Sequence, residues 1–584
     1  MLQIFCKNTG TSKSFSEGSS LLEILSEFEF DHPYPIVSAK VNNVSQGLKF
    51  RVYNNKEVEF LDVTSYSGRR VYTRSLCFVL YKAASDLFPG CKLYIEHPIS
   101  NGYYCVLQKE GGVSDANIEA LRSRMQDIID KDIPFRREEV QTDEALRIFR
   151  ERGFDDKVRL IETCGQVYVD YYTLGNTVDY YYGRLLPSAG HLTVWGLERY
   201  HDGLLLRIPD KNDPTQLAPV VPHPKTFEVF AENLRWNNIM GLSNVGDVNC
   251  ACLSGHASAL IQVSEALQEK KIVQIAEEID RRFRREANPV RIVLISGPSS
   301  SGKTTFCKRI SIQLAACGLL PVSLSTDDYF VNRVDTPLLP DGSYDFDNFE
   351  TVDHAALQRD LLRLLAGEEV EVPQYNFVTG RREYLGKRLQ LTPGTVLLVE
   401  GIHALNPRLT DQIPDSDKFR IYISTLTSIS LDDHNWIPTR DNRLLRRIIR
   451  DYNAGAFTAR ETIRQWPKVC EAEEKWIFPY QEQADVMFNS ALLIEFAVLR
   501  LHAEPILASV PKNCPEYSEA HRLLRFIHYF TPVSDKEIPP TSLLREFVGG
   551  SSFKYRWHPR HPCFTLCLRS GREGGRSTNY VFSE

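Results

Sequence analysis

Residues Gly297–Thr304 read GPSSSGKT and fit the spacing GxxxxGK followed by Ser or Thr. They follow the apolar run VRIVLIS and open a helical pattern, which is the strand–loop–helix context that this spacing requires. Glycine lets the backbone approach a ligand closely, and the N–H groups of such a loop point inward beside a helix N-terminus. Lys303 is expected to reach the β- and γ-phosphates of ATP, and the Thr304 hydroxyl to ligate Mg²⁺. The predicted ATP-binding loop comprises Gly297, Pro298, Ser299, Ser300, Ser301, Gly302, Lys303, Thr304 and Thr305.

Carboxylates stand where buried strands are expected to end. Asp327 and Asp328 follow the strand pattern LPVSLST, and Glu400 ends the run TVLLVE. Open α/β sheets bind ligands beyond the carboxyl ends of their strands. Asp327 is therefore expected to take the proton from a substrate hydroxyl, and Glu400 to hold Mg²⁺. The alternative for Glu400 is a strand cap that needs no ion.

Arginines recur at helical spacing downstream of these carboxylates. They are Arg440, Arg443, Arg446, Arg447 and Arg450. Such a run is usually a solvated helix face, but beside a phosphate loop it suits a lid that clamps phosphate.

Strand-like and helix-like periods alternate between residues 290 and 500. VRIVLISG, LPVSLST and TVLLVEGI are buried-strand runs, whereas KTTFCKRISIQLAACG and HAALQRDLLRLLAG are helical. This alternation predicts an α/β domain built on a parallel sheet with helices on both faces.

Four further regions and a tail are expected around this domain. Residues 1–62 alternate as short strands, residues 63–245 mix helices and strands, and residues 246–289 form a connecting helix. Residues 501–555 are expected to be helical. Residues 556–584, with five arginines and two glutamates, are expected to be a loose tail.

The composition of the 584 residues narrows the class of protein. Lys and Arg total 69 against 75 Asp and Glu, and this net charge of −6 argues against a dedicated polyanion binder. No apolar run reaches the ~18–20 residues of a membrane span. The first residues lack the pattern of a secretion signal, so we expect a cytoplasmic protein. Thirteen cysteines without a CxxC pair favour reduced thiols over a zinc site.

Several of these segments resemble, in order, the uridine kinase and phosphoribulokinase family of P-loop enzymes. GPSSSGKTT resembles its phosphate loop, TDDYF its segment with the acceptor-facing aspartate, and RLLRRIIRD its lid arginines, here Arg447 and Arg450. The resemblance implies that Asp347 in YDFDNFETVDH binds the ribose hydroxyls and that Tyr375 in PQYNF lines the base. Past PQYNF the chain reads VTGR, where pyrimidine-nucleoside kinases carry a base-contacting histidine, and NAGA follows RRIIRD in place of ERGR.

The N-terminal half resembles parts of aminoacyl-tRNA synthetases. Residues 1–62 are similar to a TGS domain, a small β-grasp-like unit, and residues 63–245 to the α+β second additional domain of threonyl- and alanyl-tRNA synthetases. Arg74, Phe78 and Leu185 stand where the resemblance expects metal-binding histidines. Metal-assisted hydrolysis therefore has no evident apparatus here, and a binding or regulatory module is expected. RNA contact through this half stays open.

Two functions from different classes follow from these residues. The first is an ATP-dependent kinase that phosphorylates a nucleoside 5′-hydroxyl, as in uridine or cytidine kinases, or else a sugar phosphate or a cofactor. The second is an ATP-gated regulatory protein that binds RNA. The sequence leaves the acceptor, the choice between ATP and GTP and the oligomeric state open.

Overall fold

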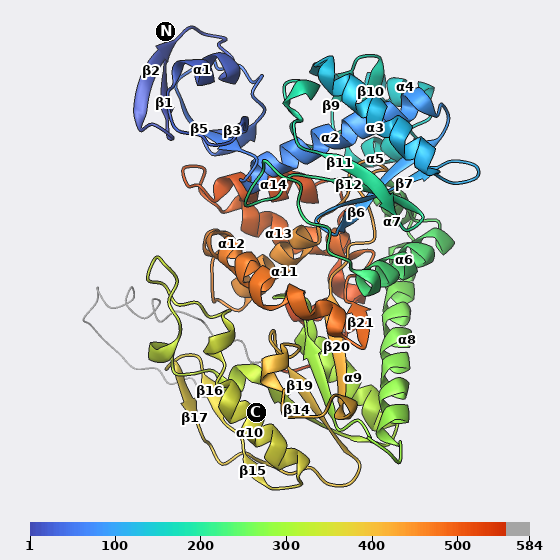
Figure 1. Ribbon diagram of the computed structural model, residues 1–584, viewed down its shortest axis with the longest axis vertical. Coiled ribbons are helices and arrows are strands. Elements are labelled where there is room, and N and C mark those ends of the chain that lie inside the picture. The colour runs from blue at the N-terminus through green and yellow to red at the C-terminus, as the bar shows by residue number, and fades with distance from the viewer. Residues whose placement is uncertain (556–584) are drawn as a thin grey trace, which may run out of the picture.

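The computed structural model describes residues 1–555, which begin with a small five-stranded sheet and one helix. The strand order is β2-β1-β5-β3-β4, and the unit lies at one end of the molecule in Figure 1. A capping box starts the helix, because the Ser20 hydroxyl accepts from the backbone of Glu23 and the Glu23 carboxylate accepts from Ser20. The elements are β1 Leu2–Cys6, β2 Thr11–Phe15, α1 Leu21–Glu27, β3 Ile36–Val41, β4 Val44–Gln46 and β5 Lys56–Asp62.

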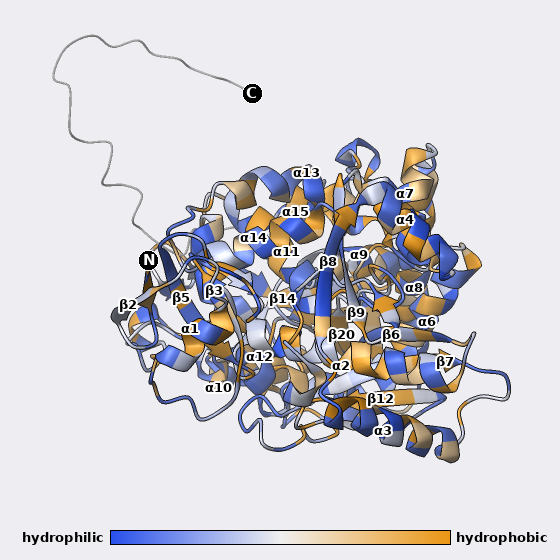
Figure 2. Ribbon diagram, turned by 90° about the horizontal axis from the view of Figure 1, so that it is seen from above, coloured by the Kyte–Doolittle hydropathy of each residue, from blue (hydrophilic) through white to orange (hydrophobic). Residues whose placement is uncertain are grey.

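The next region is built around the helix α2, which is buried along most of its length. It shares a hydrophobic core with the helix α3 and with the antiparallel sheet β11-β12-β7-β6. A second sheet, β10-β9-β8, carries the hydrophilic strand β8 on its edge, coloured blue in Figure 2. The elements are α2 Tyr66–Leu87, β6 Lys92–Ile99, β7 Gly102–Gln108, α3 Asp115–Asp130, β8 Phe135–Gln141, α4 Thr142–Glu151, α5 Asp155–Cys164, β9 Tyr168–Leu174, β10 Thr177–Asp179, β11 Gly196–Tyr200 and β12 Gly203–Arg207.

Three helices connect this region to the second half of the chain. They are α6 Pro224–Ile239, α7 Val245–Leu253 and α8 Ala257–Phe283. The segment predicted as a single connecting helix thus contains two helices, because Gly255, with φ of 83°, interrupts the helical path. The long helix α8 runs along one side of the molecule in Figure 1 and packs Ile272, Ile275 and Ile279 against the helix α9.

A five-stranded parallel sheet with the order β14-β19-β13-β20-β21 forms the centre of residues 290–500. Ile292 and Leu294 of β13 pack with the helix α10, whereas Val293 and Ile295 pack with α8 and α9. The predicted α/β class, with helices on both faces of a parallel sheet, is confirmed. The elements are β13 Ile292–Ser296, α9 Lys303–Ala316, β14 Leu320–Ser325, α10 His354–Leu365, β15 Val370–Glu371, β16 Gln374–Asn376, β17 Arg381–Glu383, β18 Arg388–Leu389, β19 Thr395–Glu400, β20 Lys418–Ser424 and β21 Val486–Asn489.

The remaining helices join the two halves of the molecule. Leu444 of α11 and Phe526 of α14 belong to the same hydrophobic core as Phe149 and Leu160 from the N-terminal half. This core includes residues from both sides of positions 245 and 500, so hydrophobic packing does not separate domains there. The domain boundaries that we placed at these positions stay predictions. The helices are α11 Thr439–Asn453, α12 Ala459–Trp476, α13 Glu495–Ala508, α14 Tyr517–Ile527 and α15 Arg545–Val548.

Two expectations from the composition concern the described part of the chain. No helix within residues 1–555 is long and apolar enough to cross a membrane. The eleven cysteines in this part are free thiols. The predicted loose tail, residues 556–584, lies outside the described residues.

A buried ionic cluster also links the two halves. Lys157 of α5 is fully buried, and its Nζ lies 3.2 Å from Asp432, 3.4 Å from Asp179 and 3.4 Å from Asp156. His434 Nδ1 lies 2.8 Å from Asp179. Burial alone would lower the pKa of Lys157, but the carboxylates around it raise this pKa well above its ordinary value.

Replacing Lys157 with Met is expected to destabilise the protein by about 3–5 kcal/mol, since three buried carboxylates would lose their cation. The midpoint of urea unfolding, followed by circular dichroism, measures this effect. Lys131→Met is the matched control, because Lys131 is exposed and lies 3.9 Å from Asp127. Equal midpoints for the two variants would show that water or protonation neutralises the cluster.

Candidate nucleotide site

The loop between β13 and α9 has the backbone that a phosphate site requires. A Cβ on residue 297 would lie 2.3 Å from the carbonyl oxygen of Ile423, so only glycine fits beside β20. Gly302 has φ of 85°, in the left-handed region, and α9 begins directly after it at Lys303. Strand, loop and helix thus follow one another where the sequence predicts them, with the helix N-terminus at the loop.

Lys303, Thr304 and Glu400 lie together at the carboxyl edge of the sheet. Thr304 Oγ1 donates to Glu400 Oε1 at 3.3 Å, and Lys303 Nζ donates to the carbonyl oxygen of Pro298 at 3.0 Å. Burial lowers the pKa of Lys303 and raises the pKa of Glu400 to about 7, and the charge of each group opposes the shift of the other. A half-buried hydroxyl next to a half-buried carboxylate is an oxygen pair that suits Mg²⁺.

Asp327 joins this group through the neighbouring strand. It lies in the short 3₁₀ turn Thr326–Tyr329, directly after Ser325, which pairs in register with Glu400. The charge of Asp327 opposes the burial-driven fall in the pKa of Lys303 and adds to the burial-driven rise in the pKa of Glu400. A Cβ on Gly401 would lie 1.8 Å from Thr326 Oγ1, so glycine there lets the ends of β14 and β19 approach.

Carboxylates that the sequence did not single out accept hydrogen bonds from the phosphate loop. The backbone N–H of Ser299 donates to Glu473 Oε1 of α12 at 2.8 Å. Thr305 donates to Glu546 Oε2 of α15 through its hydroxyl at 2.6 Å and its backbone N–H at 3.3 Å. Three donors that could bind an anion are therefore already engaged by acidic side chains of the same chain. Residue type and local spacing carry no signal for these contacts, since 174 and 241 residues separate the partners.

The arginine run lies on a packed helix in this structure, and its role as a lid stays a prediction. Helix α11 is buried along most of its length, where it packs against α12, α13 and α15. Arg443 is bound by Glu473, and Arg446 by both oxygens of Glu495. Arg447 does reach the loop, because its Nη1 donates to Ser299 Oγ at 3.0 Å. Arg450 pairs with its neighbour Asp451 at 2.9 Å.

The two residues predicted to bind the acceptor have different surroundings. The charge of Asp347 adds to the burial-driven rise in the pKa of Glu473, which accepts from the loop residue Ser299, and opposes the burial-driven fall in the pKa of His403 to about 4. Tyr375 is only 3% exposed and packs edge-on between the rings of Phe330 and Phe377. Tyr375 belongs to a hydrophobic core here, and the roles assigned to Asp347 and Tyr375 stay predictions.

No metal centre is evident in the synthetase-like region. Phe78 and Leu185, at two positions where histidines were expected, are buried in the hydrophobic core. Within residues 1–555 no three His, Cys, Asp or Glu side chains are grouped so that they could hold a metal ion.

Both halves of the chain match known proteins. Residues 292–493 match the model of the phosphoribulokinase / uridine kinase family. The N-terminal half is similar to threonine–tRNA ligases. That of Rubrobacter xylanophilus is 31% identical over 162 residues, which are 28% of this chain and 25% of the relative. That of Natranaerobius thermophilus is 32% identical over 199 residues, which are 34% and 31% of the two proteins. The chain thus spans about a third or less of the length of these relatives.

Two solved structures are similar to part of this chain at low identity and with low TM-scores. A "possible uridine kinase" from Bacillus stearothermophilus is 17% identical, with a TM-score of 0.27 over 38% of this chain and 98% of that one. D-glycerate 3-kinase from Cryptococcus neoformans var. grubii is 17% identical, with a TM-score of 0.21 over 46% and 89%. Residues 292–493, which contain the phosphate loop, thus match the phosphoribulokinase / uridine kinase family model, and the N-terminal half is similar to threonine–tRNA ligases.

Proposed function

We propose that this protein transfers the γ-phosphoryl group of ATP to a hydroxyl of a nucleoside-like acceptor. The observation that carries the proposal is the grouping of Lys303, Asp327 and Glu400 beside the phosphate loop, at the ends of three adjacent strands. Phosphoryl transfer needs little covalent chemistry from the protein, so catalysis depends on positioning and on neutralising charge. A cation, a carboxylate for the proton and a carboxylate for the metal meet that need.

Each residue has a role that its position allows. Asp327 would orient the acceptor hydroxyl and accept its proton as the oxygen attacks the γ-phosphorus. Lys303, released from its hydrogen bond to Pro298, would neutralise the β- and γ-phosphate oxygens. Arg447, already at the loop, would add a second cation. Thr304 and Glu400 would hold Mg²⁺, whose charge further neutralises the phosphates.

The acceptor class rests on Asp347, whose charge acts on Glu473 and which would bind a ribose diol. We therefore favour a nucleoside 5′-hydroxyl, as in uridine or cytidine kinases, and keep a sugar phosphate or a cofactor as the alternative. The test is ADP release by the purified protein with Mg-ATP and a panel of nucleosides, sugar phosphates and cofactors. A phosphorylated product that appears only with one acceptor would support the proposal. No acceptor-dependent ADP release across the panel would oppose it.

A second candidate, an ATP-gated regulatory protein that contacts RNA, is favoured by one observation. Glu473 and Glu546 occupy donors of the phosphate loop, as expected if nucleotide binding displaces them and changes the contacts of α12 and α15. Nucleotide binding without turnover, together with retention of tRNA on a filter, would support this function.

Replacing Glu546 with Gln is expected to tighten Mg-ATP binding roughly three- to tenfold, because two unit charges near a protein surface repel by about 1 kcal/mol or more. The amide oxygen can still accept from Thr305, so the fold of α15 should persist. Isothermal titration calorimetry measures the dissociation constant. Glu537→Gln, at an exposed position of the same C-terminal segment, is the control. Unchanged or weaker ATP binding in Glu546→Gln would mean that the carboxylate does not compete with phosphate.

A further inference from the structure

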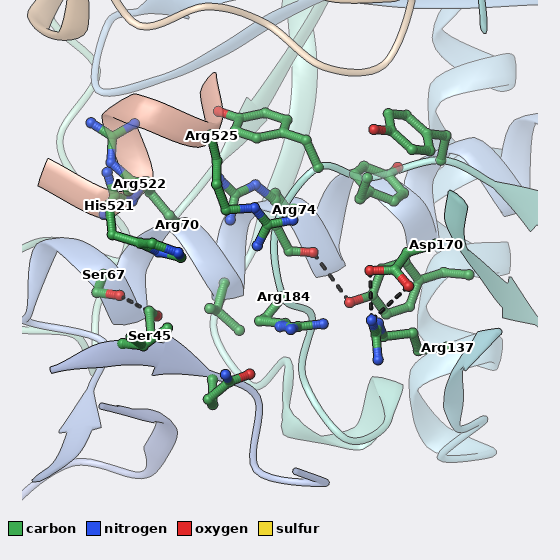
Figure 3. A pocket seen from close by; sticks show the side chains of 18 of the residues that line it. Ser45, Ser67, Arg70, Arg74, Arg137, Asp170, Arg184, His521, Arg522 and Arg525 are labelled. Carbon is green, nitrogen blue, oxygen red and sulfur yellow. Dashed lines mark hydrogen bonds and ion pairs between the residues drawn. The ribbon is translucent and has the colours of Figure 1, made fainter. Parts of the chain in front are cut away.

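A second concave site lies far from the phosphate loop in the chain, where the first unit, the synthetase-like region and α14 meet. The cavity has a volume of about 590 Å³ and is lined by residues from β4, α2, β8, β9, the segment after β10, and α14. This volume falls within the range of small-molecule sites, about 300–1,000 Å³. Figure 3 shows arginines from α2, α14 and the segment after β10 around the same space.

The lining is strongly positive. It contains six arginines and His521 against two carboxylates, Glu139 and Asp170. Both carboxylates are already paired with Arg137, at 3.4 Å and 2.6 Å. Burial and the charges of Arg525 and Lys512 together lower the pKa of His521. The pocket thus presents cations whose charge its own acids do not balance.

Two more of the six arginines pair with carboxylates that do not line the pocket. Arg70 pairs with Glu519 at 3.3 Å, although its buried Nη1 has no hydrogen-bond partner. Arg522 pairs with Asp441 at 2.7 Å and with Glu519 at 2.6 Å. The other three, Arg74, Arg184 and Arg525, have no ion pair within residues 1–555.

Of these three arginines, Arg74 gives the strongest evidence for an anion site. It is only 7% exposed, and its guanidinium lies 4.7 Å from the ring centroid of Tyr182. It packs so closely on Gly183 that a Cβ there would lie 2.1 Å from Arg74 Nη1. A guanidinium that is largely buried and has no ion pair within residues 1–555 loses part of its hydration without a charged group to replace it, which is costly. An anion that enters the pocket would remove that cost.

We propose that this pocket binds a phosphate-bearing small molecule of the size of a mononucleotide. Three guanidinium groups on separate elements match the several oxygens and roughly double charge of a phosphate better than they match a single carboxylate. The volume exceeds what a free phosphate ion fills, and the rings of Tyr172 and Tyr182 line the space beside Arg74 and Arg184. This site is separate from the phosphate loop and does not depend on the kinase function proposed above.

Isothermal titration calorimetry on the full-length protein tests the proposal, with AMP, inorganic phosphate and adenosine as probes. Because the phosphate loop can bind the same probes, the titrations are made in the Lys303→Met background, alone and combined with a second substitution. Arg74→Gln is expected to weaken AMP binding about tenfold or more, as the loss of one charge-assisted hydrogen bond would. Arg525→Gln, at an exposed position, should also weaken binding and carries little risk to folding. Arg281→Gln is the matched control, since Arg281 is exposed and pairs with Glu278 on α8.

The same series contains the results that would overturn the proposal. The proposal would be refuted if AMP bound with the same affinity in the Arg74→Gln and Arg525→Gln variants as in their parent. It would also be refuted if neither AMP nor phosphate bound outside the phosphate loop. Retention of a short single-stranded RNA in an Arg74-dependent way without any binding of AMP would refute it as well. Thermal unfolding separates ligand binding from a structural role. Ligand-free Arg74→Gln should melt no lower than its parent, because the substitution removes an unpaired buried charge, whereas a structural arginine would give a lower melting temperature.

Discussion

An Asp327→Asn variant is expected to lose about 10²–10⁴-fold in turnover, which is the usual contribution of a general base. The side chain keeps its shape and its place after β14, but it can no longer accept the proton of the acceptor hydroxyl. Mg-ATP binding should persist, because Lys303, Thr304 and the loop backbone are unchanged. Turnover is measured as ADP release with the acceptor that the panel assay identifies, and ATP affinity by calorimetry.

Asp335→Asn is the matched control for this variant. Asp335 lies eight residues further along, is exposed, and should leave both turnover and ATP binding unaltered. If Asp327→Asn kept wild-type turnover, the assignment of Asp327 as the base would be wrong. If turnover and ATP affinity fell together, Asp327 would act mainly through the charges of Lys303 and Glu400.

A Lys303→Met variant is expected to lose about 10²–10³-fold in turnover, as when a preorganised donor to a developing charge is removed. Methionine has a similar length and suits the buried position, so the loop should keep its backbone. ATP binding should weaken as well, because the β- and γ-phosphates lose their nearest cation. Single-turnover measurements at saturating ATP separate the slower chemical step from weaker ATP binding.

Lys308→Met, on the same helix α9, is the control for helix stability. Wild-type turnover in Lys303→Met would contradict the assigned role and would point to Arg447, which contacts Ser299, as the principal cation. In that case, the combination of Lys303→Met with Arg447→Gln should abolish the activity that remains.

The central sheet and the phosphate loop could be predicted from the sequence because their causes are local. Apolar runs such as IVLIS read as strands buried on both faces, and the glycines around GPSSSGKT read as a loop that approaches a phosphate. Asp327 and Glu400 stand at strand ends, so the rule that ligands bind at the carboxyl edge was enough to bring them together.

The arginine run shows where the same reasoning stops. Helical spacing predicts a helix at residues 440–450, and the structure has α11 there, but spacing does not reveal what faces each side chain. Glu473 and Glu495 lie on other helices, 30 and 49 residues away from the arginines that they neutralise. The arginines of the predicted lid therefore lie on a packed helix, from which Arg446 and Arg447 contact the loop.

By itself the sequence determined the α/β class, the phosphate loop and the carboxylates beside it, since these depend on periodicity and on residues adjacent in the chain. Only the tertiary structure brought Glu546 onto Thr305, Lys157 among three aspartates, and Arg74 into a cavity where it has no ion pair within residues 1–555. Those contacts join elements hundreds of residues apart or in separate layers. Their energy arises from burial, which takes charged groups out of water and makes the identity of each neighbour decisive.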